Sequence, residues 1–354
     1  MMKIAIISFY LLAADDWGYG YPVHCLASQF VFRGHEVTVF TQSLRPEGAI
    51  YEVQVVSCEG SWRAIRFAWK LRRIDLSEFD VLHAHGHDWF LGGVSRPPHI
   101  RTYHRSQLSE IAYEPLLNER LRMFRLAVCE WASCAVPDQS VAVAHNLRRF
   151  LPSVERVIPN GVNPNVFNKA AKKSRVPSIL FVGARLGRTQ GDALMRTFQR
   201  EVREKSPEAK LWMVCDEKVA GPGVLWFGRS CLPLFAQLYR NAWVFCLPSC
   251  YEGCGVRYLK AMAAGSAIVA TPNVGACEAK GAEDSLLLVG MEELGETLVR
   301  LLQQPSLRQG LEEQGAERAS HFHWDRICSE YEDIYEEARL PVRGVYVKST
   351  QTAL

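Results

Sequence analysis

The sequence lacks any long uninterrupted apolar run. No window approaches the ~18 consecutive apolar residues that suggest a membrane-spanning helix, so we expect none. The opening MMKIAIISFYLLAADD has one Lys ahead of a short apolar run, and it breaks into Asp15 and Asp16 without a small-residue cleavage site. This is not the pattern of a secretory signal peptide, and we expect a cytoplasmic protein.

The chain also lacks a strong excess of charge and an even cysteine count. Its formal net charge of +3 argues against a main role in coating nucleic acid. Its 11 cysteines lie scattered in apolar contexts, which favours reduced thiols over a disulfide framework. With 48% hydrophobic and 22% charged residues, the 354 residues are typical of a globular protein of two domains.

What the sequence does contain is an alternation of apolar strands and amphipathic helices. KIAIISFYL (3–11) predicts a buried parallel strand, and VHCLASQFVFRG (23–34) has helical spacing and ends at a glycine. Further strands are predicted at HEVTVFT (35–41), YEVQVVS (51–57) and FDVLHAH (79–85). This rhythm predicts an α/β fold with doubly wound parallel sheets.

A turn-rich connection, RVIPNGVNPNVF (156–167), interrupts the alternation before it restarts at SILFVGA (178–184). We therefore expect two Rossmann-like lobes facing each other across a cleft. The expected boundaries are 1–165 for the N-terminal lobe, 166–325 for the C-terminal lobe, 326–340 for a helix packing back toward the N-terminal lobe, and 341–354 for a mobile tail. Ligands bind at the carboxyl ends of parallel strands, which predicts a site in the cleft between the lobes.

Two motifs invite cofactor or metal interpretations that their residues do not complete. Gly18 and Gly20 follow the first strand, but Val23 stands where a dinucleotide fingerprint has its third glycine. The loop is either a plain connection or a helix N-terminus whose amides meet an anionic diphosphate. HAHGHD (83–88) has three alternating histidines but no second cluster. It therefore predicts a polar strand end at the cleft, and no metal site.

Two other patterns have both a structural and a functional interpretation. The segment 60–74, GSWRAIRFAWKLRRI, carries five basic residues and no acid. We favour a surface helix with one buried side; the alternative is a patch for a lipid surface or a phosphorylated acceptor. Cys246, Cys250 and Cys254 recur every four residues across a strand, a loop and a helix start, and we expect packing or cleft-lining thiols.

The ordered set of segments from RGHEVTVFT (33–41) to CYEGCGVRYLKAMAAGSAIVATPNVG (250–275) resembles the retaining glycosyltransferases of family 4. The resemblance covers roughly residues 2–335. It implies the two-lobed GT-B fold and transfer of a hexose from a nucleotide-diphosphate sugar, most simply a UDP-sugar, with retention. It also implies no metal or other cofactor. The acceptor stays open between a sugar, a lipid-linked sugar and a small molecule.

The resemblance also implies a site. His104 would face the donor sugar, Arg185 would grip the diphosphate, and Glu252, the first glutamate of an E-x7-E motif, would meet the sugar hydroxyls. Further donor-binding positions are implied at Gly18, Gly20, Arg188, Gln190, Phe227, Gly228, Arg229, Gly253, Cys254, Gly255, Val256 and Lys260.

Two positions depart from the family pattern. Lys260 stands where the second glutamate of the motif grips the ribose, and Gln190 replaces a lysine that partners the arginine. Three roles are open for Lys260: a phosphate contact, a pair with an acid such as Glu278, or a sign of a disabled site. If the family geometry is otherwise kept, Lys260→Glu is expected to tighten UDP binding.

We favour an active enzyme, because the catalytic positions persist. The alternatives are a non-catalytic GT-B scaffold or regulatory nucleotide-sugar-binding protein, and a relative resembling a sugar-nucleotide epimerase.

Overall fold

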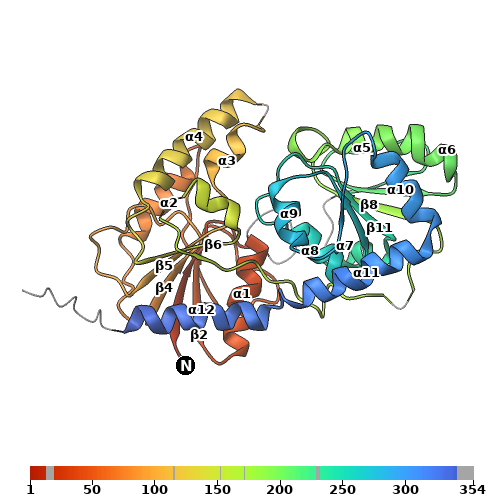
Figure 1. The fold of residues 1–354 in the computed structure, drawn as a ribbon. Helices are drawn as coiled ribbons and strands as arrows, with labels where there is room; N and C mark the ends of the chain where they lie inside the picture. The colour runs from red at the N-terminus through yellow and green to blue at the C-terminus, as the bar shows by residue number, and fades with distance from the viewer. Residues whose placement is uncertain (13–19, 115, 152, 171, 229–231, 341–354) are drawn as a thin grey trace, which may run out of the picture.

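The structure is a computed structural model that describes residues 1–12, 20–114, 116–151, 153–170, 172–228 and 232–340, and it forms two α/β lobes (Figure 1). Gly18, Arg229 and the tail 341–354 lie outside the described residues. No helix in the described ranges is long and apolar enough to cross a membrane.

The N-terminal lobe is built on a seven-stranded sheet in the order β3-β2-β1-β4-β5-β6-β7, and every pairing is parallel. Its strands are β1 (Lys3–Ile7), β2 (Glu36–Thr41), β3 (Glu52–Val55), β4 (Val81–Ala84), β5 (His99–Tyr103), β6 (Gln139–Ala142) and β7 (Arg156–Val157). Its helices are α1 (Gly20–Phe32), α2 (Arg63–Leu71), α3 (Gln107–Ile111), α4 (Leu117–Ala132) and the 3-10 helix η1 (His145–Arg149).

The C-terminal lobe holds a six-stranded parallel sheet in the order β10-β9-β8-β11-β12-β13. Its strands are β8 (Ser178–Val182), β9 (Lys210–Val214), β10 (Val224–Phe227), β11 (Val244–Leu247), β12 (Ala267–Ala270) and β13 (Leu287–Leu288). Its helices are η2 (Gly187–Thr189), α5 (Gly191–Thr197), the π-helical η3 (Phe198–Val202), α6 (Arg203–Lys205), α7 (Leu232–Asn241), α8 (Val256–Ala263), α9 (Val274–Lys280), α10 (Leu294–Gln303) and α11 (Pro305–Ser320).

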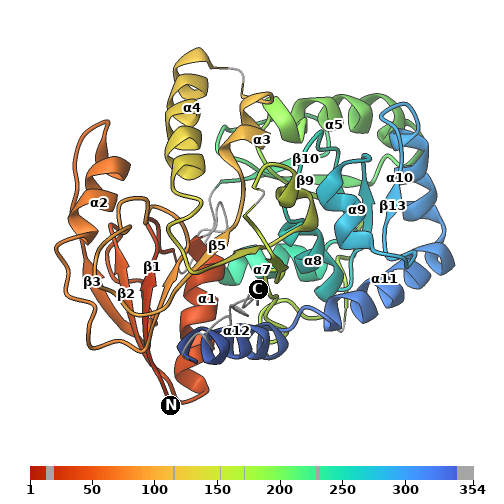
Figure 2. The same cartoon turned by 60° about the vertical axis from the view of Figure 1, so that its left-hand side comes forward.

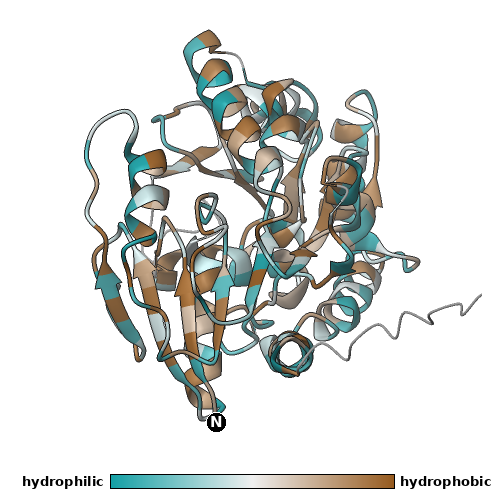
Figure 3. Ribbon diagram, turned by 90° about the vertical axis from the view of Figure 1, so that its left-hand side faces the viewer, coloured by the Kyte–Doolittle hydropathy of each residue, from teal (hydrophilic) through white to brown (hydrophobic). Residues whose placement is uncertain are grey.

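The central strands of both sheets are buried along their length. Ile4, Ile6 and Ile7 of β1 are fully buried, as are all four residues of β11. Helices cover both faces of each sheet, so these strands have no solvent face and read as continuous apolar runs. Figure 3, coloured by hydropathy, shows apolar segments along the inner strands.

The last helix, α12 (Trp324–Arg339), follows the C-terminal lobe but packs on the N-terminal lobe, beside α1 (Figure 2). Its Tyr331 hydroxyl lies 3.0 Å from the Thr102 hydroxyl, and its Tyr335 hydroxyl lies 2.5 Å from Nδ1 of His83. On its outer side Arg33 donates to Glu332 at 2.6 Å. The helix therefore holds the two lobes together through a second crossing of the chain.

In each sheet the strand order reverses once, between β1 and β4 and between β8 and β11. Such a reversal leaves a crevice at the carboxyl ends of the strands, where open parallel sheets bind ligands. The segments that follow β1, β8 and β11 all line one cavity between the lobes. The crevices of the two sheets therefore border the same cavity between the lobes.

Candidate active site

The cavity between the lobes has a volume of about 560 Å³. Its described walls come from both lobes, and they contain three arginines against two glutamates. The lining residues are Tyr10, Leu12, Gly20, Pro22, His104, Arg105, Glu110, Asn160, Val182, Ala184, Arg188, Thr189 and 252–257.

The loop between β11 and α8 forms one wall, as the sequence predicts. Gly253, Cys254, Gly255 and Val256 line the cavity, so the N-terminal end of α8 borders it. Gly255 has a φ of +64°, and a Cβ there would lie 2.7 Å from the carbonyl oxygen of Gly275. The first N–H groups of a helix have no partner within it, and together with the helix dipole they favour an anionic ligand.

Gly20 forms part of the opposite wall, at the start of α1. A Cβ on Gly20 would lie 3.2 Å from the backbone of Tyr10 and of Leu12, so a larger residue would push these segments apart. The glycine thereby lets the chain after β1 pass close to the helix start. Of the two glycines predicted here, Gly20 lines the cavity and Gly18 lies outside the described residues.

Glu252 lies at the cavity wall but does not present a free carboxylate. Its two oxygens accept from Nη2 of Arg257 at 2.9 and 2.8 Å, and Oε1 also accepts from the Ser249 hydroxyl at 2.8 Å. Nη1 of Arg257 donates to the carbonyl of Val182 at 2.9 Å. Burial acts to lower the pKa of Arg257, but Glu252 outweighs it and the net shift is upward.

Sequence reasoning missed Arg257. Its signal was a charged residue in the first turn of α8, five residues after Glu252, where the turn lies against the cavity. The pair holds the Glu252 side chain in one direction, and both residues line the cavity.

Arg188 is the arginine that reaches this cavity from the loop after β8. Its Nη1 lies 3.2 Å from Oε1 of Glu110, on α3 of the other lobe. The same carboxylate accepts from Arg105 at 3.2 Å. Two guanidinium groups therefore share one carboxylate at the cavity wall, and the local charge stays positive.

Arg185, which was predicted to grip the diphosphate, lies beside two carboxylates of its own lobe. Arg185 is not among the residues that line the cavity. Its Nε and Nη2 donate to the two oxygens of Asp192 at 2.8 and 3.1 Å, and its Nη1 donates to Glu217 at 3.0 Å. Two carboxylates on its own lobe hold the side chain, and Arg188 takes the place near the cavity.

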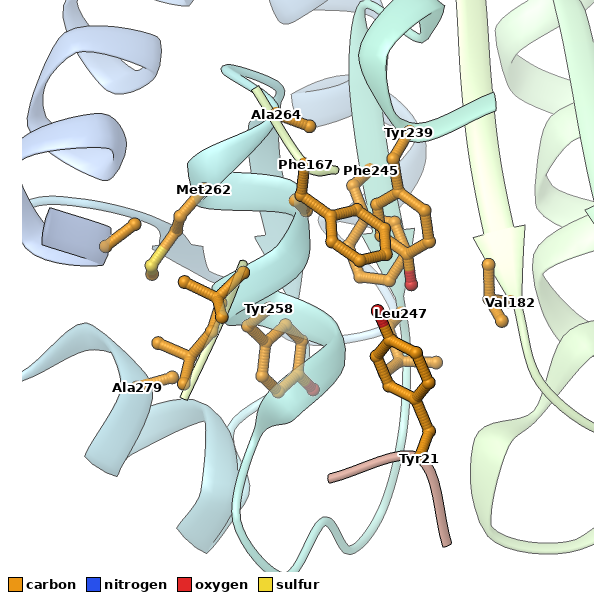
Figure 4. Packing of buried hydrophobic residues seen from close by; sticks show 14 of the residues in the cluster. Tyr21, Phe167, Val182, Tyr239, Phe245, Leu247, Tyr258, Met262, Ala264 and Ala279 are labelled. Carbon is orange, nitrogen blue, oxygen red and sulfur yellow. The ribbon is translucent and has the colours of Figure 1, made fainter. Parts of the chain in front are cut away.

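Lys260, the other predicted cation, also has a position that the sequence did not indicate. Lys260 does not line the cavity, and it is only 1% exposed to solvent. Its Nζ lies 4.8, 5.2 and 5.8 Å from the ring centres of Tyr21, Phe167 and Phe235, in the aromatic packing that Figure 4 shows around Tyr21 and Phe167. Burial holds the pKa of Lys260 well below its usual range.

The three aromatic residues around Nζ of Lys260 are not among the residues that line the cavity. The carboxylate of Glu278 instead accepts from the backbone N–H groups of His145 and Asn146, at 2.8 and 2.7 Å. Glu278 therefore bridges the lobes through η1.

Gln190, Phe227 and Gly228 also lie outside the cavity lining. Gln190 has a φ of +53° and caps α5, and its side chain contacts the Cys250 thiol. Phe227 ends β10 and packs against Trp212. Of the three recurrent cysteines, Cys246 is buried, Cys250 is exposed and Cys254 lines the cavity.

The predicted histidine positions meet at the carboxyl ends of β4 and β5. Nδ1 of His85 lies 2.8 Å from Nε2 of His104, and His83 contacts the hydroxyls of Tyr335 and Thr102. Burial first, and then Arg105, lowers the pKa of His104 to about 3. His104 is therefore neutral near pH 7. In the described part of the chain, no group of three or more His, Cys, Asp or Glu side chains is placed to hold a metal ion.

A second and larger cavity, of about 960 Å³, lies within the N-terminal lobe. It is lined by polar and apolar residues, among them residues of α2 and α4, and it shares Tyr10, His104 and Arg105 with the first cavity. Glu130 of α4 lies on its wall, where burial raises the pKa to about 7 against the hydrogen bond from the Gln107 backbone. The two cavities therefore meet at three shared side chains.

Two families of known proteins match the chain, one for each lobe. Residues 20–166 match the family described as Glycosyltransferase Family 4, and residues 176–304 match Glycosyl transferases group 1. A D-inositol 3-phosphate glycosyltransferase of Corynebacterium jeikeium is 24% identical over 97% of this chain and 98% of its own.

Solved structures show the same fold. A sucrose-phosphate synthase from Thermosynechococcus elongatus superposes with a TM-score of 0.78 at 20% identity, covering 95% of this chain and 99% of its own. The Anabaena protein HepE, in complex with UDP and glucose, superposes with a TM-score of 0.74 at 13% identity, covering 95% and 100%. Both are two-lobed proteins like this chain, and the likeness is one of fold.

Proposed function

The chain belongs to the family 4 glycosyltransferases, and we propose that it moves a hexose from a nucleotide-diphosphate sugar to an acceptor, with retention and without a metal ion. A UDP-sugar is the preferred donor, because a protein of the same fold is known in complex with UDP and glucose. The acceptor is a sugar, a lipid-linked sugar or a small molecule.

The observation that carries the proposal is the meeting of two cavities at Tyr10, His104 and Arg105. The smaller one lies at the carboxyl ends of both sheets and has an anion-favouring helix start and Arg188 in its wall. It suits the donor. The larger one lies in the N-terminal lobe and suits the acceptor, so the sugar passes from one to the other where they meet.

Each wall then has a part in the reaction. The bond between the anomeric carbon and the phosphate oxygen breaks, and negative charge collects on the leaving diphosphate. Arg188 and the first amides of α8 stabilise that charge without a proton transfer. The acceptor oxygen forms the new bond to the anomeric carbon, and the proton of its hydroxyl passes to an oxygen of the leaving diphosphate.

Glu252 is proposed to orient the sugar hydroxyls, with Arg257 fixing its position. His104 lies at the junction of the cavities and is neutral near pH 7, so it can accept a hydrogen bond without adding charge. Closure of the lobes around both ligands would keep water from the donor carbon.

Titration calorimetry with UDP, GDP and ADP tests the donor site. We expect UDP to bind, and Arg188→Ala to weaken binding about tenfold or more, in line with the loss of a charge-assisted contact of about 1.5–3 kcal/mol. Arg185→Ala is the matched control and should change affinity little. If none of the nucleotides binds, the proposal fails and a non-catalytic scaffold is favoured. NMR of the anomeric proton in the product tests retention.

A further inference from the structure

Helix α4 carries an apolar stripe on its solvent side. Leu117, Leu121, Phe124, Val128 and Trp131 follow one another at spacings of four, three, four and three residues, so they share one helical face. They are between 51% and 69% exposed. The opposite face, with Met123, Leu126 and Ala127, is buried against the lobe. The stripe is therefore additional to the side that anchors the helix.

The position of α4 leaves this stripe open. Figures 1 and 2 show the helix standing at the outer end of the N-terminal lobe, away from α12, and the helix at the top of Figure 3 alternates apolar and polar segments. Solvent-exposed apolar side chains are ordinary when they are scattered. Five in a row along four turns form a contiguous patch, which marks a contact surface.

Basic residues border the stripe on both sides. Helical geometry places Arg120 along one edge and Arg125 along the other, and both are exposed. The acidic residue of the first turn, Glu119, lies on a different side, where Arg122 pairs with it at 2.7 Å. No acidic side chain of α4 lies on the stripe or along its edges, so the face as a whole is apolar and cationic.

Helix α2 extends the same surface. The guanidinium group of Arg125 lies 4.9 Å from the ring centre of Trp62, which precedes α2, and this contact joins the two helices. Trp62 and Trp69 are about half exposed. The segment 60–74 carries five basic residues, of which Arg63 lines the larger cavity. We name Trp62, Arg120, Arg125 and the five-residue stripe the α2–α4 face.

We propose that the α2–α4 face docks on an anionic lipid bilayer. Leucine, phenylalanine and tryptophan enter the boundary between headgroups and acyl chains, and arginine pairs with anionic headgroups beside them. A second copy of the chain is the other partner that an apolar stripe can take. It fits less well, because a symmetric pairing would set the Arg120 and Arg125 edges of two copies against each other.

Docking places the larger cavity at the membrane surface. Trp62, Arg63 and Arg125 line that cavity and also lie in or beside the face, so its mouth opens next to the contact. Resting on the function proposed above, this geometry indicates an acceptor whose polar head enters the cavity while its apolar part stays in the bilayer.

Vesicle sedimentation with the full chain tests the docking without any donor or acceptor. We compare vesicles of phosphatidylcholine with equimolar phosphatidylcholine and phosphatidylglycerol, at low and high salt. We expect binding only to the anionic vesicles, weakened by salt. Arg120→Glu with Arg125→Glu should weaken binding at least about tenfold, since each basic residue contributes about 1 kcal/mol near such a surface. Leu121→Ser with Phe124→Ser should also weaken it.

Phe32→Ser with Leu340→Ser is the matched control, since it removes two exposed apolar side chains away from the face. It should bind vesicles like the unaltered chain. The altered residues are exposed, so circular dichroism should show unchanged melting for all variants. Absence of binding to anionic vesicles would overturn the proposal. So would a lipid-free dimer that Leu121→Ser with Phe124→Ser dissociates. UDP affinity, measured separately, reports on the donor site alone.

Discussion

The pairing of Glu252 with Arg257 tests what stabilises the cavity wall formed by residues 252–257. The perturbation is Arg257→Met, which keeps an unbranched apolar stem and removes the guanidinium group with its charge. The Glu252 side chain is only 7% exposed, and the guanidinium group bonds both of its oxygens. Without Arg257, the carboxylate keeps the Ser249 hydroxyl among its contacts in the described structure.

The expected cost follows from these contacts. Removing one partner of a fully buried ion pair costs about 3–5 kcal/mol. Arg257 keeps 18% exposure, so water screens part of the remaining charge. The carbonyl of Val182 also loses its donor, which adds about 1 kcal/mol. We therefore expect Arg257→Met to lower the free energy of unfolding by about 3 kcal/mol.

Urea unfolding followed by tryptophan fluorescence measures this cost, with Glu252→Gln and the double variant completing a mutant cycle. If the two side chains stabilise each other, the double variant loses less than the sum of the single losses, by about 1.5 kcal/mol or more. Losses that add within about 0.5 kcal/mol would show that the two groups act independently. That result would refute the claim that Arg257 positions Glu252.

Three further predictions follow from single residues. Lys260→Glu should lower the free energy of unfolding by about 3 kcal/mol or more, because it buries a carboxylate against three ring faces. It should not tighten UDP binding. Urea unfolding measures the first effect and calorimetry the second, with Lys260→Met as the milder control. Burial, then His104 and His99, lowers the pKa of His83 to about 3. The neutral His83 therefore stabilises the folded protein fully above the unfolded pKa of about 6.5, and this stabilisation is lost as the pH falls from 6.5 toward 3. His83→Asn should flatten the dependence of the urea midpoint on pH in that window, and an unchanged slope would contradict it. Gly255→Ala should cost about 1–3 kcal/mol in the same unfolding assay, because φ is +64° and the carbonyl of Gly275 is close; a fully stable variant would show that the loop relaxes freely.

The fold was predictable because its signal is repeated along the chain. The segment HEVTVFT contains β2 and the segment FDVLHAH contains β4, as their apolar pattern indicates. The two-lobed architecture then follows from the restart at SILFVGA, which became β8. Each of these segments is buried in the way that its own residues require, so tertiary contacts did not override local preference.

The apolar stripe of α4 shows why a surface is harder to predict than a core. Its Leu, Phe, Val and Trp residues have the spacing of a buried helix face. The same sequence pattern occurs whether the face packs against its own lobe or stays exposed to contact a partner. Only the exposed fractions separate the two cases. Exposure depends on which other elements pack nearby, and that is a tertiary property.

Of the predicted site residues, those of the loop after β11 line the cavity, whereas Arg185 and Lys260 do not. The loop 253–256 lines the cavity because its place is fixed by β11 and α8. Arg185 turns away because Asp192 lies seven residues later, across the start of α5, where its carboxylate meets the guanidinium group. An ion pair of this kind depends on a turn geometry that the spacing of the two residues does not reveal.

Lys260 shows the same limit, and it changes the account of the site. Its role was implied by the E-x7-E motif, whose second position falls on α8, and α8 begins only at Val256. Glu252 lies in the preceding loop, so the helical period does not relate the two residues. Lys260 therefore projects from the buried side of α8 into the aromatic rings. Lys260 and Arg185 do not line the cavity, so Arg188 and Arg105 supply positive charge there, and the single carboxylate of Glu110 offsets only half of it. Under the proposed function, these two guanidinium groups are the expected partners of the donor diphosphate.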